Sequence, residues 1–329
     1  MNTLAPDIDQ LPWVSGHLDS STFEWFKIAL SDGLARQTAF ALAESRIRNA
    51  GARVPRGKFE RQWMNAIKWT AHHGNIVSAQ SDALQPSQPS IDYHRVDAIV
   101  REGIGLYDLW EQSPVRLDDD QAHTEEIIDV IFPDNPLLCV GVSQSIFTTR
   151  ARETFRGELH QKQFIVAQKM TRPSGVTGLG HRSAHSLDNT GPWAHYVVEF
   201  DLSAKNKTGQ DTPWAPLIRG WTNHKISVSD ACVALLDHFA GFAPLGLVLH
   251  SAGKSCHGWF PLAGAEPTQL TRFRHEALTL GADPALFRNR SQFVRMPDGI
   301  RAENGRRQTT YYLNPEVFQH ATTHQKTES

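Results

Sequence analysis

Residues 195–204 read HYVVEFDLSA and, from Val198 onward, alternate apolar with polar side chains as a half-buried β-strand does. Because successive side chains of a strand point to opposite faces, Glu199 and Asp201 share one face. Val198, Phe200 and the following leucine take the other face, which we expect to pack into a core. Paired carboxylates on an open face suit Mg²⁺ or Mn²⁺. The alternative is an amphipathic edge strand whose acids simply face solvent.

A second stretch, VLHSAGKSCHGWF at residues 248–260, contains the letters GKS that end a phosphate-binding P-loop. A P-loop also needs a glycine at the position that Val248 occupies, so the motif is incomplete. The pattern instead indicates a hairpin, whose returning strand carries Ser255 and His257 on one face. Together with Lys254 in the turn, these side chains are candidates for binding phosphate. The alternative for His257 is a structural histidine.

Two acids one residue apart on a strand, followed by S-x-H, resemble the archaeo-eukaryotic primase superfamily, in its mobile-element branch of phages and plasmids. The stretch SAGKSCHGWF is similar to that branch's S-G-G-K-S-x-H-x-W pattern and departs from it at Ala252. SQFVRMPDGIR at residues 291–301 and RRQTTYYLNP at residues 306–315 also resemble the branch. The resemblance covers about residues 137–315, and the two motifs here are Glu199-Phe200-Asp201 and Ser255-Cys256-His257.

The resemblance implies an α+β fold with an RRM-like catalytic antiparallel sheet and flanking helices. It also implies a DNA primase or primase-polymerase that makes or extends primers on single-stranded DNA during phage, plasmid or other mobile-element replication. Glu199 and Asp201 would hold the Mg²⁺ or Mn²⁺ ions of a two-metal nucleotidyl transfer, with His257 as a further catalytic residue. Ser255, His257 and Lys254 would contact the nucleoside triphosphate.

The family also has a third metal-binding acid, for which two positions are candidates. Asp283 in LGADPALF is the preferred one, and Asp298, in a Pro-Asp-Gly stretch typical of a plain turn, is the alternative. Arg295, in the strand QFVRM, is expected to bind phosphate. Three further arginines are expected to line the template path: Arg301, Arg306 and Arg307.

The chain is expected to contain two domains. Residues 1–77 are predicted to form a small helical N-terminal domain, with helices at 36–50 and 58–72, and residues 78–91 a linker. Residues 92–318 are predicted to form the catalytic domain and residues 319–329 a polar tail. Within the catalytic domain we expect strands at 137–142 and 163–167 and helices at 149–161 and 268–280. The basic residues of the N-terminal domain form either a solvated face or a DNA-contacting module.

Composition limits the remaining classes. Of the 329 residues, 40% are apolar and 21% charged, which is typical of a soluble globular protein. No apolar run approaches 18 residues and no leader is evident, so a membrane span or secretory signal is not expected. The three cysteines are widely spaced, which favours a reducing cytoplasm. The net charge of −2 means that nucleic acid would meet a local basic patch.

Two other functions compete with a primase. One is a catalytically inactive, primase-derived replication-initiation or DNA-binding protein, and the other is a metal-dependent nuclease that uses the same carboxylates. A replicative helicase partner would be a separate chain, because this one lacks a Walker motif. His181 and His185 are four residues apart, but the glycines around them indicate a loop, which disfavours a zinc site.

Overall fold

The computed structural model describes residues 22, 25–27, 36–49, 59, 62–67, 89–117, 121–178 and 180–319. The chain divides into two compact units, Met1–Pro86 and Ser87–Ser329. Most of the expected linker (78–91) and polar tail (319–329) lies outside the described residues.

In the first unit, helix α2 spans Arg36–Asn49, and Phe59 and residues 62–67 are also helical. The side chains of Ala39, Ala43 and Ile47 are four residues apart, so they share one face of α2, and all three are fully buried. The Phe40 ring packs edge-on against Phe59, with centroids 5.4 Å apart. Most of the basic residues expected to form a charged face lie outside the described residues, and Arg48 pairs with Glu44 of its own helix.

The second unit contains two four-stranded sheets, in which all neighbouring strands are antiparallel. The first sheet has the order β2 (Phe147–Ala151), β1 (Leu137–Gly141), β3 (Phe164–Val166) and β9 (Phe293–Arg295). The second has the order β10 (Thr310–Leu313), β7 (Leu247–His250), β8 (Cys256–Pro261) and β6 (His195–Glu199). A short hairpin, β4 (Gly175–Val176) and β5 (Arg182–Ser183), stands apart from both.

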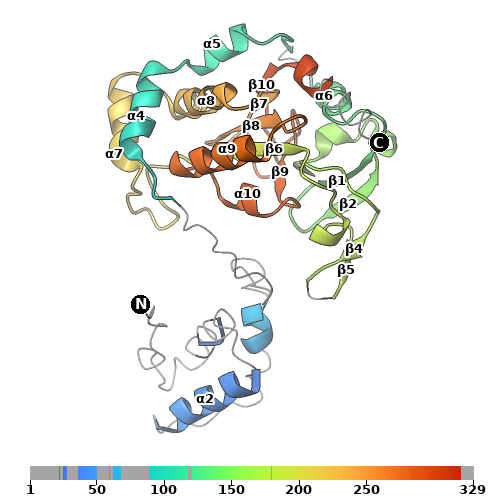
Figure 1. Ribbon diagram of the computed structural model, residues 1–329, viewed down its shortest axis with the longest axis vertical. Coiled ribbons are helices and arrows are strands. Elements are labelled where there is room, and N and C mark those ends of the chain that lie inside the picture. Colours follow the sequence, from blue (N-terminus) through green and yellow to red (C-terminus); the bar gives the residue numbers. More distant parts are fainter. Residues whose placement is uncertain are drawn as a thin grey trace. The chain divides into compact units, whose positions relative to one another are not determined.

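Helices complete the unit, and the α+β class expected from the sequence is confirmed (Figure 1). Ser227 caps α8 and forms a capping box with Asp230, and a proline begins α9, so both helices start where local sequence favours it. The helices are α4 (Tyr93–Glu102), α5 (Leu106–Glu111), α6 (Thr124–Ile131), α7 (Ala215–Asn223), α8 (Val228–His238), α9 (Pro267–Thr279) and α10 (Ala285–Arg288).

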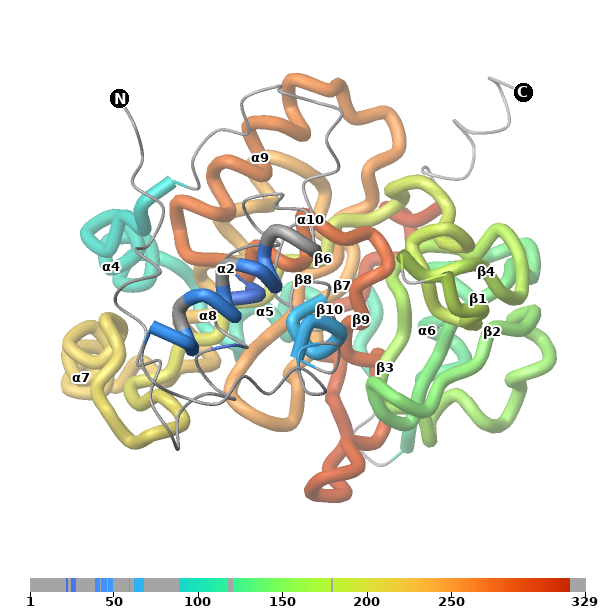
Figure 2. Tube along the Cα trace, turned by 90° about the horizontal axis from the view of Figure 1, so that it is seen from below, coloured from blue at the N-terminus to red at the C-terminus, as the bar shows by residue number. Residues whose placement is uncertain are grey.

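The second sheet is the middle layer of the unit. On one face, Val198, Phe200 and Phe260 join a core cluster with residues of α4, α8 and α9. On the other face, Val197 and Trp259 join a cluster that includes side chains of α6 and of the first sheet. Figure 2 shows β1, β2 and α6 on one side of the unit and α4, α7 and α8 on the other. Both faces of the second sheet are therefore buried, which leaves its strand ends for polar chemistry.

The sequence predicted strands β1, β3, β6, β7, β8 and β9 and helix α9, and it was wrong at residues 149–161. There β2 runs to Ala151 and pairs with β1, and two 3₁₀ helices follow, Arg152–Phe155 and Leu159–Gln161. Pairing with the buried β1 strand outweighs the helical propensity of this segment. In the described part of the chain, none of the helices has both the length and the apolar character needed to cross a membrane.

Candidate active site

The two sequence motifs meet where β6 ends and β8 begins. Glu199 and His257 are register partners in neighbouring antiparallel strands, so their side chains project from the same face. Oε1 of Glu199 lies 3.3 Å from Nε2 of His257. The hydroxyl of Ser255 donates a hydrogen bond to the same carboxylate oxygen at 2.9 Å. The acidic motif and S-x-H are thus joined at one carboxylate.

Alternation along the chain separates the site from the core. Phe200, which lies between the two acids, and Cys256, which lies between Ser255 and His257, are both fully buried in the helix-side cluster. Strand β6 ends at Glu199, so Asp201 follows the strand rather than lying in it, and its side chain is exposed. The intervening apolar residues therefore orient the motif residues away from α8 and α9.

Ser251 and Ser255 hold the turn between β7 and β8 closed through backbone and side-chain contacts. The backbone N–H of Ser251 donates to the carbonyl oxygen of Ser255 at 2.9 Å, and the two hydroxyl oxygens are 3.0 Å apart. Lys254 is exposed in this turn, and its ammonium group donates to the hydroxyl of Ser203 at 3.2 Å. Lys254 therefore lies beside the segment that carries Asp201.

A second loop supports the same turn through two hydrogen bonds. The guanidinium of Arg301 donates to the Ser251 carbonyl at 3.4 Å, and the Asn304 amide donates to the Ala252 carbonyl at 3.0 Å. A Cβ atom added to Gly253 would lie 2.3 Å from Nη1 of Arg301, so the glycine makes room for this arginine. Sequence reasoning missed this role of Asn304, and nothing in its sequence context indicates it.

The Glu199 carboxyl group is more acidic than an ordinary glutamate. Burial by itself raises the pKa of Glu199, but the nearby His257 ring, the Ser255 hydroxyl and the Arg295 charge together lower it to about 2. Opposite charges and hydrogen bonds to the ionised form have this effect. Glu199 is therefore an anion throughout the physiological pH range.

Asp283 is joined to Glu199 through the main chain. Its backbone N–H donates to the carbonyl oxygen of Glu199 at 2.9 Å. Burial raises the pKa of Asp283, and the charges of Glu199 and Asp201 raise it further, against the effects of the Ala285 N–H and His257. The three carboxylates therefore generate one region of negative potential, which a cation would relieve.

Asp298, the alternative third acid, has a structural role. Its side chain is buried, and its two carboxylate oxygens accept backbone N–H groups of Thr310 at 2.8 Å and of His123 at 3.1 Å. These bonds tie the start of α6 to β10. Of the two candidates, only Asp283 is joined to Glu199.

Arg295 extends from β9 of the first sheet. Its guanidinium carbon lies 4.7 Å from the centroid of the Phe164 ring, and its Nη1 is buried and has no hydrogen-bond partner within the described residues. Burial lowers the pKa of Arg295, as does the charge of Arg301, while Glu199 and Glu303 oppose both. An N–H group of this kind is available to an anionic ligand.

The three arginines expected on the template path have different environments. Arg301 pairs with Glu303 at 3.1 Å besides supporting the turn. Arg307 donates to the carbonyl oxygen of Gln121, and Arg306 is exposed.

His185 of the expected loop pair stacks on Phe293, with ring centroids 4.1 Å apart, while His181 is exposed. These two histidines therefore have different environments.

The acids fit a divalent cation by their chemistry. Mg²⁺ binds to one or two protein carboxylates and completes its shell with water and substrate phosphates, so Glu199 and Asp201 suffice as protein ligands. Within the described ranges, no three His, Cys, Asp or Glu side chains are gathered closely enough to form a complete ligand set.

Comparison with protein-family models, curated proteins and solved structures found no match for this chain.

Proposed function

We propose that this chain is a DNA primase or primase-polymerase that transfers nucleotides by a two-metal mechanism in mobile-element replication. The observation that carries the proposal is the joining of Glu199, Ser255 and His257 at one carboxylate. In an ordinary edge strand the acids face solvent, whereas here an acid that is ionised at all physiological pH values lies against a buried imidazole. A nucleotidyltransferase needs both an anion for metal ions and N–H donors for phosphates.

The connection of the strands supports an RRM-like sheet. Strand β6 leads through α7 and α8 to β7, the hairpin returns in β8, and α9 follows, with β8 lying between β6 and β7. This β-α-α-β-β-α succession is similar to the first five elements of the β-α-β-β-α-β fold, with two helices in the place of the first helix. The next strand, β9, joins the first sheet instead, and brings Arg295 near Glu199.

The proposed roles follow from the positions of the side chains. Glu199 and Asp201 would hold Mg²⁺ or Mn²⁺, with Asp283 as the third acid. When bound, such ions activate the primer 3′-hydroxyl and neutralise charge on the leaving pyrophosphate. His257 and Arg295 would donate N–H groups to the triphosphate, Lys254 would add charge from the turn, and Ser255 would orient Glu199. Single-stranded DNA would serve as template, with any helicase on a separate chain.

The test is incorporation of labelled nucleotides on a single-stranded polypyrimidine template with Mn²⁺, supplying ribo- and deoxynucleotides in separate reactions. Asp201→Ala should reduce incorporation at least about 100-fold, because a metal ligand is lost. Glu102→Ala removes an exposed carboxylate at the end of α4 and should have no effect. Equal incorporation by wild type and Asp201→Ala would contradict the proposal.

The rival functions give different results in the same assay. A protein that binds the template without extending it under any condition would be the inactive replication-initiation type. A protein that shortens the template, and loses this activity in Asp201→Ala, would be a metal-dependent nuclease.

A further inference from the structure

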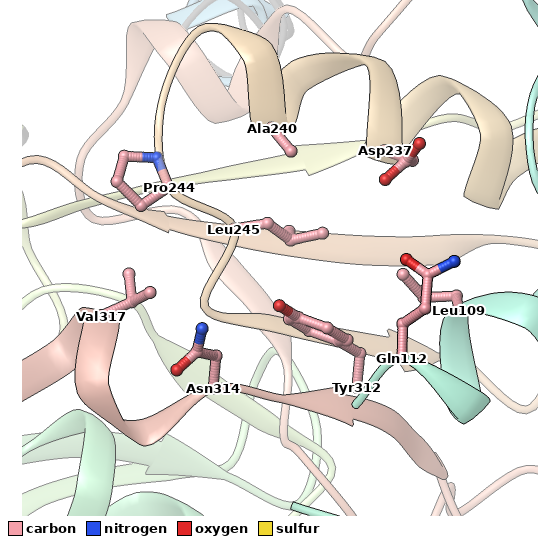
Figure 3. Close-up of a pocket in the computed structure, with 9 residues that line it drawn as sticks. All are labelled: Leu109, Gln112, Asp237, Ala240, Pro244, Leu245, Tyr312, Asn314 and Val317. Carbon is pink, nitrogen blue, oxygen red and sulfur yellow. The ribbon is translucent and has the colours of Figure 1, made fainter. Parts of the chain in front are cut away.

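A second site lies at the opposite end of the second sheet. A cavity of about 270 Å³ is lined by residues of α5, the end of α8, the start of β7 and the end of β10 (Figure 3). Leu245 lies at its centre in this view, just before β7. The candidate active site lies where β7 ends, because Leu249 is the register partner of His257. The two sites therefore lie at different ends of the same strand.

Four polar side chains converge on this cavity: Gln112, Asp237, Tyr312 and Asn314. In Figure 3 Asp237 extends from α8, and the other three lie on the facing side. Within the described residues none of the four side chains makes a hydrogen bond, and Oδ1 of Asn314 is buried without a partner. A buried amide oxygen such as Oδ1 of Asn314 normally has a hydrogen-bond partner. A few convergent polar groups in a concave site are typical of ligand recognition.

The electrostatics of the cavity favour a cation. Asp237 lies in the last turn of α8, where the carbonyl end of the helix dipole adds further negative potential. Burial raises the pKa of Asp237, and the charge of His238 opposes this shift. The His238 ring itself is directed elsewhere, because its Nε2 lies 2.8 Å from Oε1 of Glu276. Among the described residues, none that lines the cavity is basic, so they supply no counter-ion to the carboxylate.

We propose that this cavity binds a guanidinium group, with Asp237 as its counter-ion. A guanidinium carries five N–H donors and no acceptor, so the carboxylate and the side-chain carbonyls of Gln112 and Asn314 can receive them. Its planar face stacks on an aromatic ring, which Tyr312 supplies. The volume is below the ~300–1,000 Å³ of pockets for drug-sized ligands, so the guest is small. The guanidinium belongs either to a free small molecule or to an arginine of a partner protein.

The test is calorimetric titration of the full-length chain with agmatine and, separately, with the peptide acetyl-Gly-Arg-Gly-amide. We expect saturable binding with one site per chain, at least tenfold weaker in Asp237→Asn. Glu316→Gln is the matched control, because it removes an exposed carboxylate next to lining residue Val317 and should leave binding unchanged. Tighter binding of agmatine than of the peptide assigns the site to a free ligand, and the reverse assigns it to a partner arginine.

Three results would overturn the proposal. They are the absence of saturable binding of both probes, equal binding by Asp237→Asn, and binding of the diamine putrescine as tight as that of agmatine. If Asp237→Asn does not fold, Gln112→Leu replaces it, since Gln112 is exposed at the end of α5, and binding should weaken about fivefold. Glu199→Gln should bind agmatine normally, so the outcome does not depend on nucleotidyl transfer.

Discussion

Glu199 and His257 face each other across β6 and β8, with Oε1 of the acid 3.3 Å from Nε2 of the imidazole. The side chain of His257 is 2% exposed and that of Glu199 is 26% exposed. A ligand that enters from solvent therefore meets the carboxylate before the imidazole. This order suits a site in which a cation binds first and an anionic substrate follows.

Arg295→Met should weaken nucleotide binding without unfolding the protein. The buried Nη1 of Arg295 has no hydrogen-bond partner within the described residues, so the substitution costs the fold the contact with the Phe164 ring but no hydrogen bond of Nη1. A charge-assisted hydrogen bond contributes about 1.5–3 kcal/mol, which corresponds to a rise in nucleotide KM of at least about tenfold. Arg306→Met, which alters an exposed arginine, is the control. An unchanged KM in Arg295→Met would exclude a phosphate contact.

Asp283 and Asp298 should respond in opposite ways to substitution. Asp298→Ala removes the acceptor of two backbone N–H groups and should lower the free energy of unfolding by about 3 kcal/mol or more, measured by urea denaturation. Asp283→Asn should retain most of the stability and lose nucleotide incorporation. Full incorporation by Asp283→Asn would remove it from the proposed metal ligands.

Ala252→Gly should stabilise the turn between β7 and β8. Ala252 has φ of 56°, a left-handed conformation that costs a residue with a Cβ about 1 kcal/mol and glycine very little. We expect the unfolding midpoint to stay the same or rise, because greater freedom of glycine in the unfolded chain offsets part of the gain. The neighbouring change Gly253→Ala should instead displace Arg301 and lower the midpoint. A lower midpoint for Ala252→Gly would contradict the strain argument.

His195 should make the folded state sensitive to acid. Burial lowers the pKa of His195 from 6.5 to about 4, against the hydrogen bond that its Nδ1–H donates to Ala167 at 2.8 Å. The folded state therefore favours neutral imidazole, and its contribution is complete above pH 6.5 and is lost as the pH falls toward 4. This pKa difference corresponds to about 3 kcal/mol.

The measurement is the free energy of unfolding of wild type and His195→Asn as a function of pH. The wild-type value should fall by about 3 kcal/mol more than that of the variant between pH 6.5 and 4. Acid-sensitive groups common to both proteins, including His185 and Glu199, cancel in this difference. Parallel pH profiles would show that His195 is not the group responsible.

Strand alternation explains what could be predicted. Phe200 is expected to face a core because side chains alternate with a period of two, and the structure places it in the helix-side core. Cys256 alternates with Ser255 and His257 in the same way and lies in the same core. The meeting of Glu199 with His257 requires a register between strands that are 58 residues apart, and only the resemblance to a family suggested it. The exposed position of Asp201 depends on where β6 ends, which local sequence does not specify.

Other features depend on tertiary contacts and could not be predicted. Asp298 looks like a turn residue in sequence, yet its carboxylate binds amides of His123 and Thr310, which are distant in the chain. The Asp237 cavity is built from segments that share no motif. Segment 149–161 has helical propensity, but pairing with β1 makes its first part a strand.

Strand β8 contributes to the active site and to both cores at once, and this restricts how its gene can change. Deletion of a single codon within the strand would reverse the facing of every side chain beyond it. Deletion of the His257 codon, for example, would place Gly258 opposite Glu199, and the rings of Trp259 and Phe260 would exchange between the two sides of the sheet. We therefore expect β8 to diversify among natural variants by point substitution and to keep a constant length between its turn and Pro261.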